Sequence, residues 1–339
     1  MHYPSRFPRR LAQISDRRVF SLALVAVVCA ALIEPSRGQA LSQRTITLVV
    51  GYAAGGTGDM VARVVARKLS EALGQSVTVD NRPGVSGGLA TQSVARAKAD
   101  GHTILVGQSA EIAINPHWLK GLSYKPDRDL QPIALGVTVP LGLVVSAKAP
   151  YATLNDLVTS ARQSKSALSY ASAGIGTPAH FAGELLKLRT SANIKHVPYR
   201  GAGPALNDII DGRVDLYFSG LPAAMGHVRE GRIKLLAVSS DGRSAIAADV
   251  PSVAEADGLA PFDVTLWVGF FAPRRTPREI VARLNSEINE VLAQPEVKQR
   301  LLNEGAIVLP MSVDQFTSFV KAEGAKYERI IKETGLKPE

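Results

Sequence analysis

The sequence predicts an α/β protein with two parallel-sheet lobes, joined by two hinge strands with a ligand cleft between them. Strand–turn–helix units follow one another from residue 45 onward, which is typical of parallel sheets covered by helices. Two long apolar segments, 133–146 and 262–273, interrupt this alternation and are expected to cross between the lobes. Lobe 1 is therefore expected to comprise residues 41–141 and 263–339, and lobe 2 residues 142–262.

Residues 1–40 are predicted to be a signal peptide, which takes no part in the fold. They combine a basic start, an apolar run over 19–33 and small residues before a cleavage site at Ala40. That run is shorter than the roughly 20 residues of a membrane span. Arg17 and Arg18 resemble a twin-arginine signal, so general secretion and twin-arginine export both stay open. The mature chain is expected to be secreted.

The composition excludes several classes of protein. Loss of the leader removes six arginines and two acidic residues, which lowers the net charge from +9 to +5. The remaining basic residues form no cluster interleaved with aromatics, so nucleic-acid binding is not expected. The only cysteine, Cys29, lies in the leader behind Val28, where a lipoprotein signal needs a small residue. We expect neither disulfides, nor a metal site, nor a cofactor.

The first strand–turn–helix unit is the most informative stretch. Residues 46–50 form a short apolar run that is typical of a buried parallel strand. Gly55, Gly56 and Gly58 then permit a sharp turn. Apolar residues recur at helical spacing from Asp59 to a helix end at Gly74. Free N–H groups and the positive end of the helix dipole meet at this turn, which therefore predicts an anion site.

The later elements follow the same alternation. The segment 133–146, which carries the chain from lobe 1 to lobe 2, is expected to be a strand pair broken by Pro140 and Gly142. The other expected strands are 77–79 and 103–106 in lobe 1, and 168–171, 195–198, 214–218 and 234–239 in lobe 2. The other expected helices are 89–98, those that follow residues 154, 178 and 222, and 204–211, 277–293 and 314–334.

Three further glycine turns resemble the first, at 84–88, 173–178 and 199–204. Ligands of open α/β sheets bind at the carboxyl ends of the strands. All four turns are therefore expected to face the cleft.

The polar residues of these turns also have simpler roles, which stay open. Asp59 and Thr177 are economically explained as helix caps. His180 lies in the first turn of its helix, where a histidine is more often a packed or capping side chain than a ligand contact. Tyr199 and Arg200 are either rim residues or, for Arg200, a fork for a carboxylate.

An enzyme is the alternative from another class. Gly56 and Gly58 follow a strand and Asp80 ends the next one, as in a dinucleotide-binding unit, but Val61 occupies the third glycine position. The sequence has no His-Glu-x-x-His motif, and the first turn lacks the Lys-Ser/Thr of a phosphate-binding loop. Secretion also separates the chain from the cytoplasmic cofactor pool. We therefore expect a receptor and not an enzyme.

Nine short motifs occur in order along the mature chain, at residues 53–59 (Ala-Ala-Gly-Gly-Thr-Gly-Asp), 81–84, 100–103, 114–116, 174–180, 196–201, 204–206, 249–256 and 276–281. Together they resemble the Bug, or TctC-type, periplasmic solute-binding receptors of tripartite tricarboxylate transport systems. The resemblance implies the type II periplasmic-binding fold, a periplasmic location and closure of two lobes on a small carboxylate. It also implies a monomer that delivers its ligand to a large and a small permease subunit.

The resemblance further implies where the ligand binds. One carboxylate is expected at the first glycine turn, held mainly by backbone groups and bridging waters, and turns of lobe 2 complete the site. The residues implied are Ala54, Gly55, Gly56, Thr57, Asp59, Gly176, Thr177, His180, Tyr199 and Gly201. The expected set also includes the strand-end residues Ser86, Ser109, Arg200 and Ser219.

Two departures from the family bear on the ligand. Many relatives have Phe-Asp-Asn where this chain has Phe218, Ser219 and Gly220, so an acidic group at the mouth of lobe 2 is missing. Gly88 replaces a usual asparagine after the second strand. The first departure favours a plain carboxylate over an amino acid, but the acid itself stays open. A sensory component that hands a closed form to a membrane kinase is the remaining alternative, since it uses the same fold and site.

Overall fold

A computed structural model describes residues 44–338 of the chain. The predicted signal peptide 1–40, with Cys29 and the cleavage site at Ala40, lies outside these residues. The strands are β1 (Ile46–Val50), β2 (Val77–Asn81), β3 (Thr103–Gln108), β4 (Leu130–Ser146), β5 (Leu168–Ser172), β6 (Ile194–Pro198), β7 (Leu216–Gly220), β8 (Ile233–Val238) and β9 (Thr265–Pro273).

The helices vary from single turns to more than 20 residues, and η1 and η2 are a π-helix and a 3₁₀-helix. They are α2 (Thr57–Leu73), α3 (Gly88–Ala95), η1 (Ala110–Ile114), α4 (Asn115–Trp118), α5 (Pro126–Asp129), α6 (Leu154–Gln163), α7 (Pro178–Thr190), α8 (Ala202–Ile210), α9 (Leu221–Arg229), η2 (Val253–Glu255), α10 (Arg278–Ala293), α11 (Pro295–Asn303) and α12 (Val313–Thr334). In the part of the chain that the structure describes, none of them has both the length and the apolar character of a membrane span.

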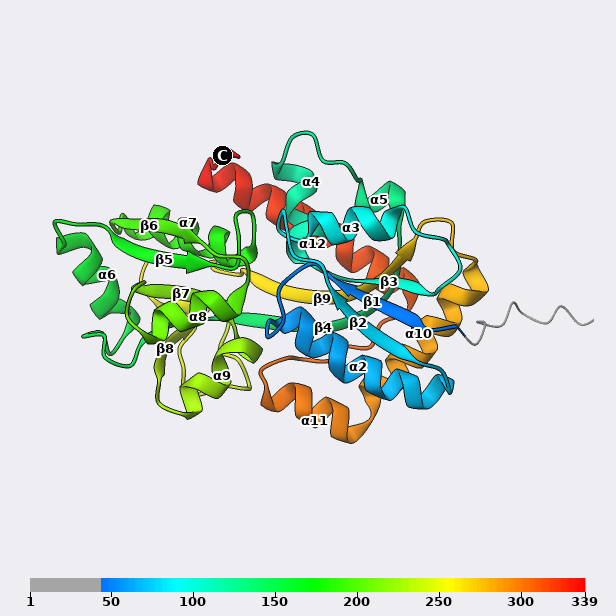
Figure 1. The fold of residues 1–339 in the computed structure, drawn as a ribbon. Helices are drawn as coiled ribbons and strands as arrows, with labels where there is room; N and C mark the ends of the chain where they lie inside the picture. Colours follow the sequence, from blue (N-terminus) through cyan, green and yellow to red (C-terminus); the bar gives the residue numbers. More distant parts are fainter. Residues whose placement is uncertain (1–43, 339) are drawn as a thin grey trace, which may run out of the picture. The chain divides into compact units, whose positions relative to one another are not determined.

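The strands pair in the order β2-β1-β3-β9-β4-β7-β5-β6, and β8 also pairs with β4. β1 is parallel to β2 and β3, and β5 is parallel to β6 and β7. The two long crossing strands, β9 and β4, run antiparallel to their neighbours. They extend from one group of strands to the other (Figure 1). The predicted α/β architecture is therefore confirmed, but the sheets are mixed and not purely parallel. The division into two lobes at the predicted boundaries stays a prediction.

The predicted strand pair around Pro140 is wrong, because β4 is one strand of 17 residues. Pro140 is the last residue opposite β9, and Leu141 is the first opposite β7, so the partner changes there without a turn. Gly142 is explained by packing: a Cβ there would lie 2.5 Å from Cδ1 of Leu235 and 2.8 Å from Cδ2 of Leu221. Pro140 thus marks the point where β4 changes its partner strand, and Gly142 the point where Leu221 and Leu235 pack closely against it.

Other differences lie at the ends of elements or in short helices. α8 begins at Ala202 and not at Pro204, which lies in the first turn, where a missing N–H costs no helical hydrogen bond. β7 begins two residues later than expected and ends at Gly220. η1, η2, α4, α5 and α11 were not predicted; the first four have only three to five residues, too few to show a helical repeat.

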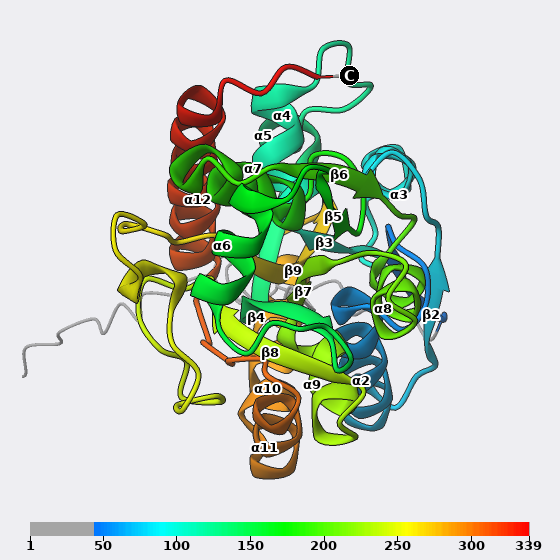
Figure 2. The same ribbon diagram turned by 90° about the vertical axis from the view of Figure 1, so that its left-hand side faces the viewer.

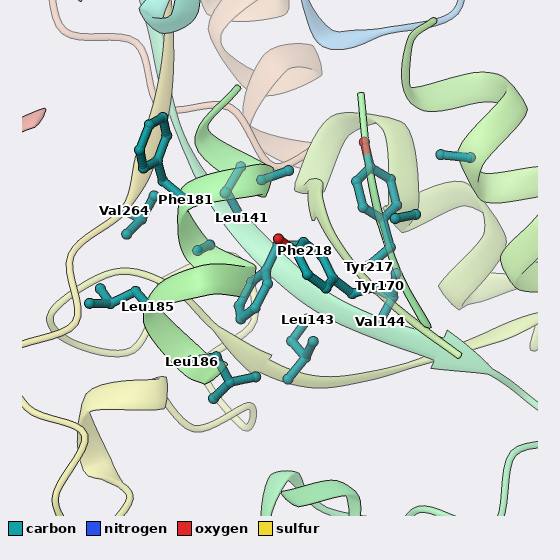
Figure 3. Packing of buried hydrophobic residues seen from close by; sticks show 14 of the residues in the cluster. Leu141, Leu143, Val144, Tyr170, Phe181, Leu185, Leu186, Tyr217, Phe218 and Val264 are labelled. Atoms are coloured by element: carbon teal, nitrogen blue, oxygen red, sulfur yellow. The ribbon is translucent and has the colours of Figure 1, made fainter. Parts of the chain in front are cut away.

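The carboxyl-terminal half of β4 packs into a large apolar cluster. Leu143 of β4, Phe218 of β7 and Phe181 of α7 lie together in it, and each is almost fully buried (Figure 3). The last helix, α12, packs alongside α7 (Figure 2). An ion pair of 2.6 Å between Arg189 on α7 and Glu333 on α12 fixes this contact at its end. The carboxyl-terminal end of α7 is therefore tied to α12.

We expect Gly183→Ala to destabilise the protein. A Cβ at residue 183 in α7 would lie 2.2 Å from Cε2 of Tyr170, a fully buried side chain of β5, so the ring or the helix must move. Overpacking of this kind costs about 1–3 kcal/mol, which urea unfolding measures. Gly226→Ala in α9 is the matched control: no described atom lies within 4 Å of its added Cβ, and alanine is the better helix former. Equal free energies of unfolding for Gly183→Ala and the wild type would contradict this packing.

Candidate functional site

An inner cavity of about 50 Å³ lies where four helices begin. The starts of α2, α7, α8 and α9 supply Gly56, Thr57, Thr177, Pro178, Ala179, Ala202 and Gly220 to its lining. The rest of the lining is Tyr52, Gln108, Ala110, Ala173 and the apolar residues Leu141, Tyr217, Phe218 and Leu266. This cavity is therefore framed by helix ends on a largely apolar wall.

The helices that begin at the cavity have no side-chain cap within the described residues. By contrast, capping boxes close the starts of α6, η2 and α12, which do not line it. The first N–H groups of a helix have no partner inside the helix, and they carry the positive end of its dipole. Among the described residues, those that line the cavity include no Asp, Glu, Lys or Arg. The electrostatics of the cavity thus favour an anion.

The first glycine turn contributes only part of its predicted set. Gly56 and Thr57 line the inner cavity, whereas Ala54, Gly55 and Asp59 line neither of the cavities described here. Asp59 instead fixes the turn, since it accepts a hydrogen bond from Gly55 N–H at 3.1 Å and pairs with Arg63 at 2.9 Å. Burial would raise the pKa of Asp59, but the hydrogen bonds from Arg63 and Gly55 outweigh it and lower that pKa. The carboxylate is therefore held away from the cavity as a brace.

A second, outer cavity of about 490 Å³ shares Tyr52 and Ala173 with the inner one. It is lined by the turns after β1, β2, β5 and β6. Ser86 lines it and donates a hydrogen bond to the Ile175 carbonyl, which joins the turn after β2 to the turn after β5. Residues 84–87 all have φ between 45° and 142°, a strained conformation for the two non-glycine residues among them. All four glycine turns therefore meet at two adjoining cavities.

The turn after β6 lies on the outer cavity. Tyr199 donates a hydrogen bond to Asp208 at 2.6 Å, and burial together with this bond raises the pKa of the phenol to about 12. Arg200 is exposed and is the only cation among the described residues that line either cavity. Gly201 is the N-cap of α8 with φ of 140°, and a Cβ there would lie 3.5 Å from that of Ala53. Arg200 thus gives the outer cavity its one positively charged side chain among the described residues.

The turn after β5 is supported from behind by two histidines. Thr177 is the N-cap of α7 and lines the inner cavity, but its hydroxyl donates to the Gly174 carbonyl at 2.7 Å and does not cap the helix. His180 accepts a hydrogen bond from Gly176 N–H at 3.2 Å, and its ring stacks on His196 with centroids 4.0 Å apart. Burial lowers the pKa of His180 to about 4, and burial and His180 lower that of His196 to about 3. His180 therefore lies behind the turn, and its predicted contact with ligand stays a prediction.

Two predicted serines are held in the backbone framework. Ser109 accepts a hydrogen bond from Trp267 N–H at 2.9 Å, and Ser219 donates one to its neighbouring carbonyl at 3.3 Å. Both are fully buried and line neither cavity. Gln108 and Tyr52 line the inner cavity and were not predicted. Side chains alternate across a strand, so of two adjacent polar residues at the end of β3 only one faces the cavity, and the sequence does not show which.

Comparisons with known proteins point to one family. Residues 61–336 match the family described as "Tripartite tricarboxylate transporter family receptor". The chain is 38% identical over 326 residues to the UPF0065 protein in the tcbD-tcbE intergenic region of Pseudomonas sp. (strain P51), with 96% of each chain covered. It is 33% identical over 321 residues to Protein BugT of Bordetella pertussis, with 94% of this chain and 98% of BugT covered.

Solved structures of similar proteins share the fold. Rpa4515 of R. palustris with adipate superposes with a TM-score of 0.85 at 36% identity, covering 88% of this chain and 99% of that one. MatC (Rpa3494) from Rhodopseudomonas palustris with bound malate gives a TM-score of 0.80 at 33% identity, covering 85% and 99%. The periplasmic binding protein BugD gives 0.83 at 31% identity, covering 87% and 99%. The predicted type II periplasmic-binding fold is therefore confirmed.

We expect acid to destabilise the protein through the two stacked histidines. Their pKa values are lowered in the folded state, so the folded protein binds fewer protons than the unfolded chain below the ordinary value of 6.5. Stability is therefore lost as pH falls from about 6.5 toward 4, by about 3 kcal/mol for His180. In His180→Asn, whose Oδ1 can still accept from Gly176, the loss measured by thermal unfolding between these pH values should be smaller. Identical pH slopes for the two proteins would contradict this assignment.

Proposed function

We propose that this chain, which belongs to the tripartite tricarboxylate transporter receptor family, binds a small carboxylate in the inner cavity and delivers it to the membrane subunits of a transporter. One observation carries the proposal: four helix N-termini without side-chain caps line a cavity that has no charged side chain among the described residues. Hydrogen bonds from N–H groups to a charged acceptor contribute about 1.5–3 kcal/mol each. A few such bonds supply the roughly 8 kcal/mol of a micromolar complex.

Dicarboxylates are the first candidates for the ligand. The similar structures of Rpa4515 and MatC contain adipate and malate. In this chain the apolar part of the inner lining, which includes Leu141, Phe218 and Leu266, suits a methylene chain. Arg200 on the adjoining outer cavity would then meet a second carboxylate. The amino-acid alternative is disfavoured, because Ser219 and Gly220 offer no side-chain carboxylate to a ligand amine.

The predicted site residues divide by position. Those proposed to face the ligand are Gly56 and Thr57 at the start of α2, Thr177 at the start of α7, and Ser86, Tyr199 and Arg200 at the outer cavity. Those proposed to shape the turns are Ala54, Gly55, Asp59, Ser109, Gly176, His180, Gly201 and Ser219. Gln108 and Tyr52 join the first group.

Capture is proposed to work by closure of the two lobes. The contacts that would break on opening join the proposed lobe 1 (41–141 and 263–339) to the proposed lobe 2 (142–262). They include the hydrogen bond from Ser86 to the Ile175 carbonyl and the edge-on contact of Trp118 with Phe181, 5.6 Å between centroids. Closure is favoured only as far as the ligand prefers the closed state. A carboxylate that meets N–H groups from α2 in one lobe and α7 in the other has that preference.

The rest of the assignment follows from the family. Its members are receptors, so we propose that this protein works in the periplasm, does no chemistry on its ligand, and acts as a monomer. Its proposed partners are a large and a small permease subunit. No group of three or more His, Cys, Asp or Glu that could hold a metal ion is found within residues 44–338.

A thermal-shift screen of the mature protein tests the function. We expect a saturable rise in melting temperature with one class among mono-, di- and tricarboxylates and amino acids, dicarboxylates first. A ligand at 100 times its dissociation constant adds about 2.7 kcal/mol of stability, which such a screen detects. If no carboxylate in the panel raises the melting temperature, the proposal is contradicted.

Thr57→Pro is expected to weaken carboxylate binding without unfolding the protein. Residue 57 is the first of α2, where proline is well tolerated, and Gly56 before it is already extended with ψ of 172°. The change deletes one N–H group at the cavity, so titration calorimetry should show an affinity at least about tenfold lower. Thr57→Ala, which keeps the N–H, is the matched control. If both variants bind equally well, the first turn takes no part in the site.

A further inference from the structure

Glu111 is a fully buried carboxyl group that the proposed ligand site does not explain. It lies in the π-helix η1, directly after Ala110 of the inner cavity. Its Oε2 accepts a hydrogen bond from the Tyr52 hydroxyl at 3.0 Å, and its Oε1 accepts one from Gln108 N–H at 2.8 Å. Tyr52 and Gln108 both line the inner cavity. One buried carboxyl group therefore connects three neighbouring parts of the cavity wall.

The same carboxyl group also meets the strained turn after β2. A Cβ at Gly87 would lie 2.5 Å from Cδ of Glu111, so only glycine leaves room for it. Ser86, the residue before this glycine, donates the hydrogen bond to the Ile175 carbonyl across the outer cavity. Glu111 thus contacts the turns that follow β1 and β2 and the end of β3.

The surroundings of Glu111 are uncharged. Tyr52 binds its carboxyl group, and the Tyr124 hydroxyl donates to its backbone carbonyl at 3.0 Å. The adjacent elements β3 and α3 carry no ionisable side chain. On the elements packed against η1, His117 of α4 is exposed, and Glu323 of α12 pairs with Lys326 at 2.8 Å. Burial raises the pKa of Glu111 to about 8, against the hydrogen bonds from Gln108 and Tyr52 that lower it. A desolvated carboxyl group of this kind is uncharged at neutral pH.

We propose that Glu111 is a positioning residue for the ligand, which as a neutral acid holds Tyr52 and Gln108 in the cavity wall without placing a second negative charge beside the bound carboxylate. This inference rests on the proposed function, since it takes the inner cavity as the carboxylate site. Above about pH 8 the acid ionises, and its charge opposes the anion. Anion binding at alkaline pH is therefore linked to uptake of one proton by Glu111.

Titration calorimetry with adipate from about pH 6.5 to about pH 9.5 tests the proposal, because a carboxylate ligand stays ionised over this range. The dissociation constant of the wild type should rise on the order of tenfold across it. Glu111→Gln keeps an acceptor for Gln108 N–H and a partner for Tyr52 but does not titrate, so its dissociation constant should stay constant. Glu323→Gln removes a different buried glutamate, which lines neither cavity, and should follow the wild type. A flat profile for the wild type, or the same slope in Glu111→Gln, would overturn the proposal.

A ligand-free measurement separates failure of this inference from failure of the proposed function. The pKa of Glu111 is raised on folding from 4.5 to about 8, so the stability that this group contributes to the wild type should be lost as pH rises between these values. Glu111→Gln lacks this loss, and its melting temperature should gain on that of the wild type as pH approaches 8. If the difference in melting temperature between Glu111→Gln and the wild type does not change with pH, Glu111 is not a neutral acid, whether or not adipate binds. If adipate fails to bind while the difference grows, the proposed ligand is wrong and the neutral acid stands.

Discussion

The convergence of helix N-termini on one small cavity is the constraint on which the rest of the structure depends. Each of these helices leaves N–H groups without a partner in its first turn, and burying such groups away from water is costly. Where α6 and α12 begin, side chains remove that cost with capping boxes. At the cavity no side chain of the described residues does so, and the donors remain available to the carboxylate that we propose binds there. The proposed site is therefore built from the backbone, and its side chains act mainly by holding turns in place.

The architecture explains how these helix ends reach one place. Parallel strands deliver their carboxyl ends to the same edge of a sheet, so the turns after β1, β2 and β3 lie together, as do those after β5 and β6. The antiparallel strands β4 and β9 then connect the two groups. Glycines allow the final approach: a Cβ at Gly220 would lie 2.7 Å from Oγ1 of Thr57 on the opposite wall. The buried braces Asp59, His180 and Glu111 fix the turns from behind without entering the cavity.

Local patterns in the sequence carried much of this information. Apolar runs and helical spacing predicted β1 and α2 almost to the residue, and the glycine turns marked the segments that line the two cavities, because both are local features. The error at Pro140 and Gly142 arose because the roles of these residues depend on contacts with residues far away in the sequence, including Leu235 and Leu221. The choice between Gln108 and Ser109 depended on which face of β3 meets the cavity. Glu111 gave no local signal at all, since its role comes from three turns that only the fold brings together.

The most direct test of the account is a crystal structure of the mature protein with adipate. The account predicts one carboxylate in the inner cavity, with its oxygens about 3 Å from backbone N–H groups at the starts of α2 and α7, directly or through one water. The second carboxylate should lie toward Arg200. A ligand held only at the outer cavity by side chains, with no polar contact to these helix starts, would contradict the central claim.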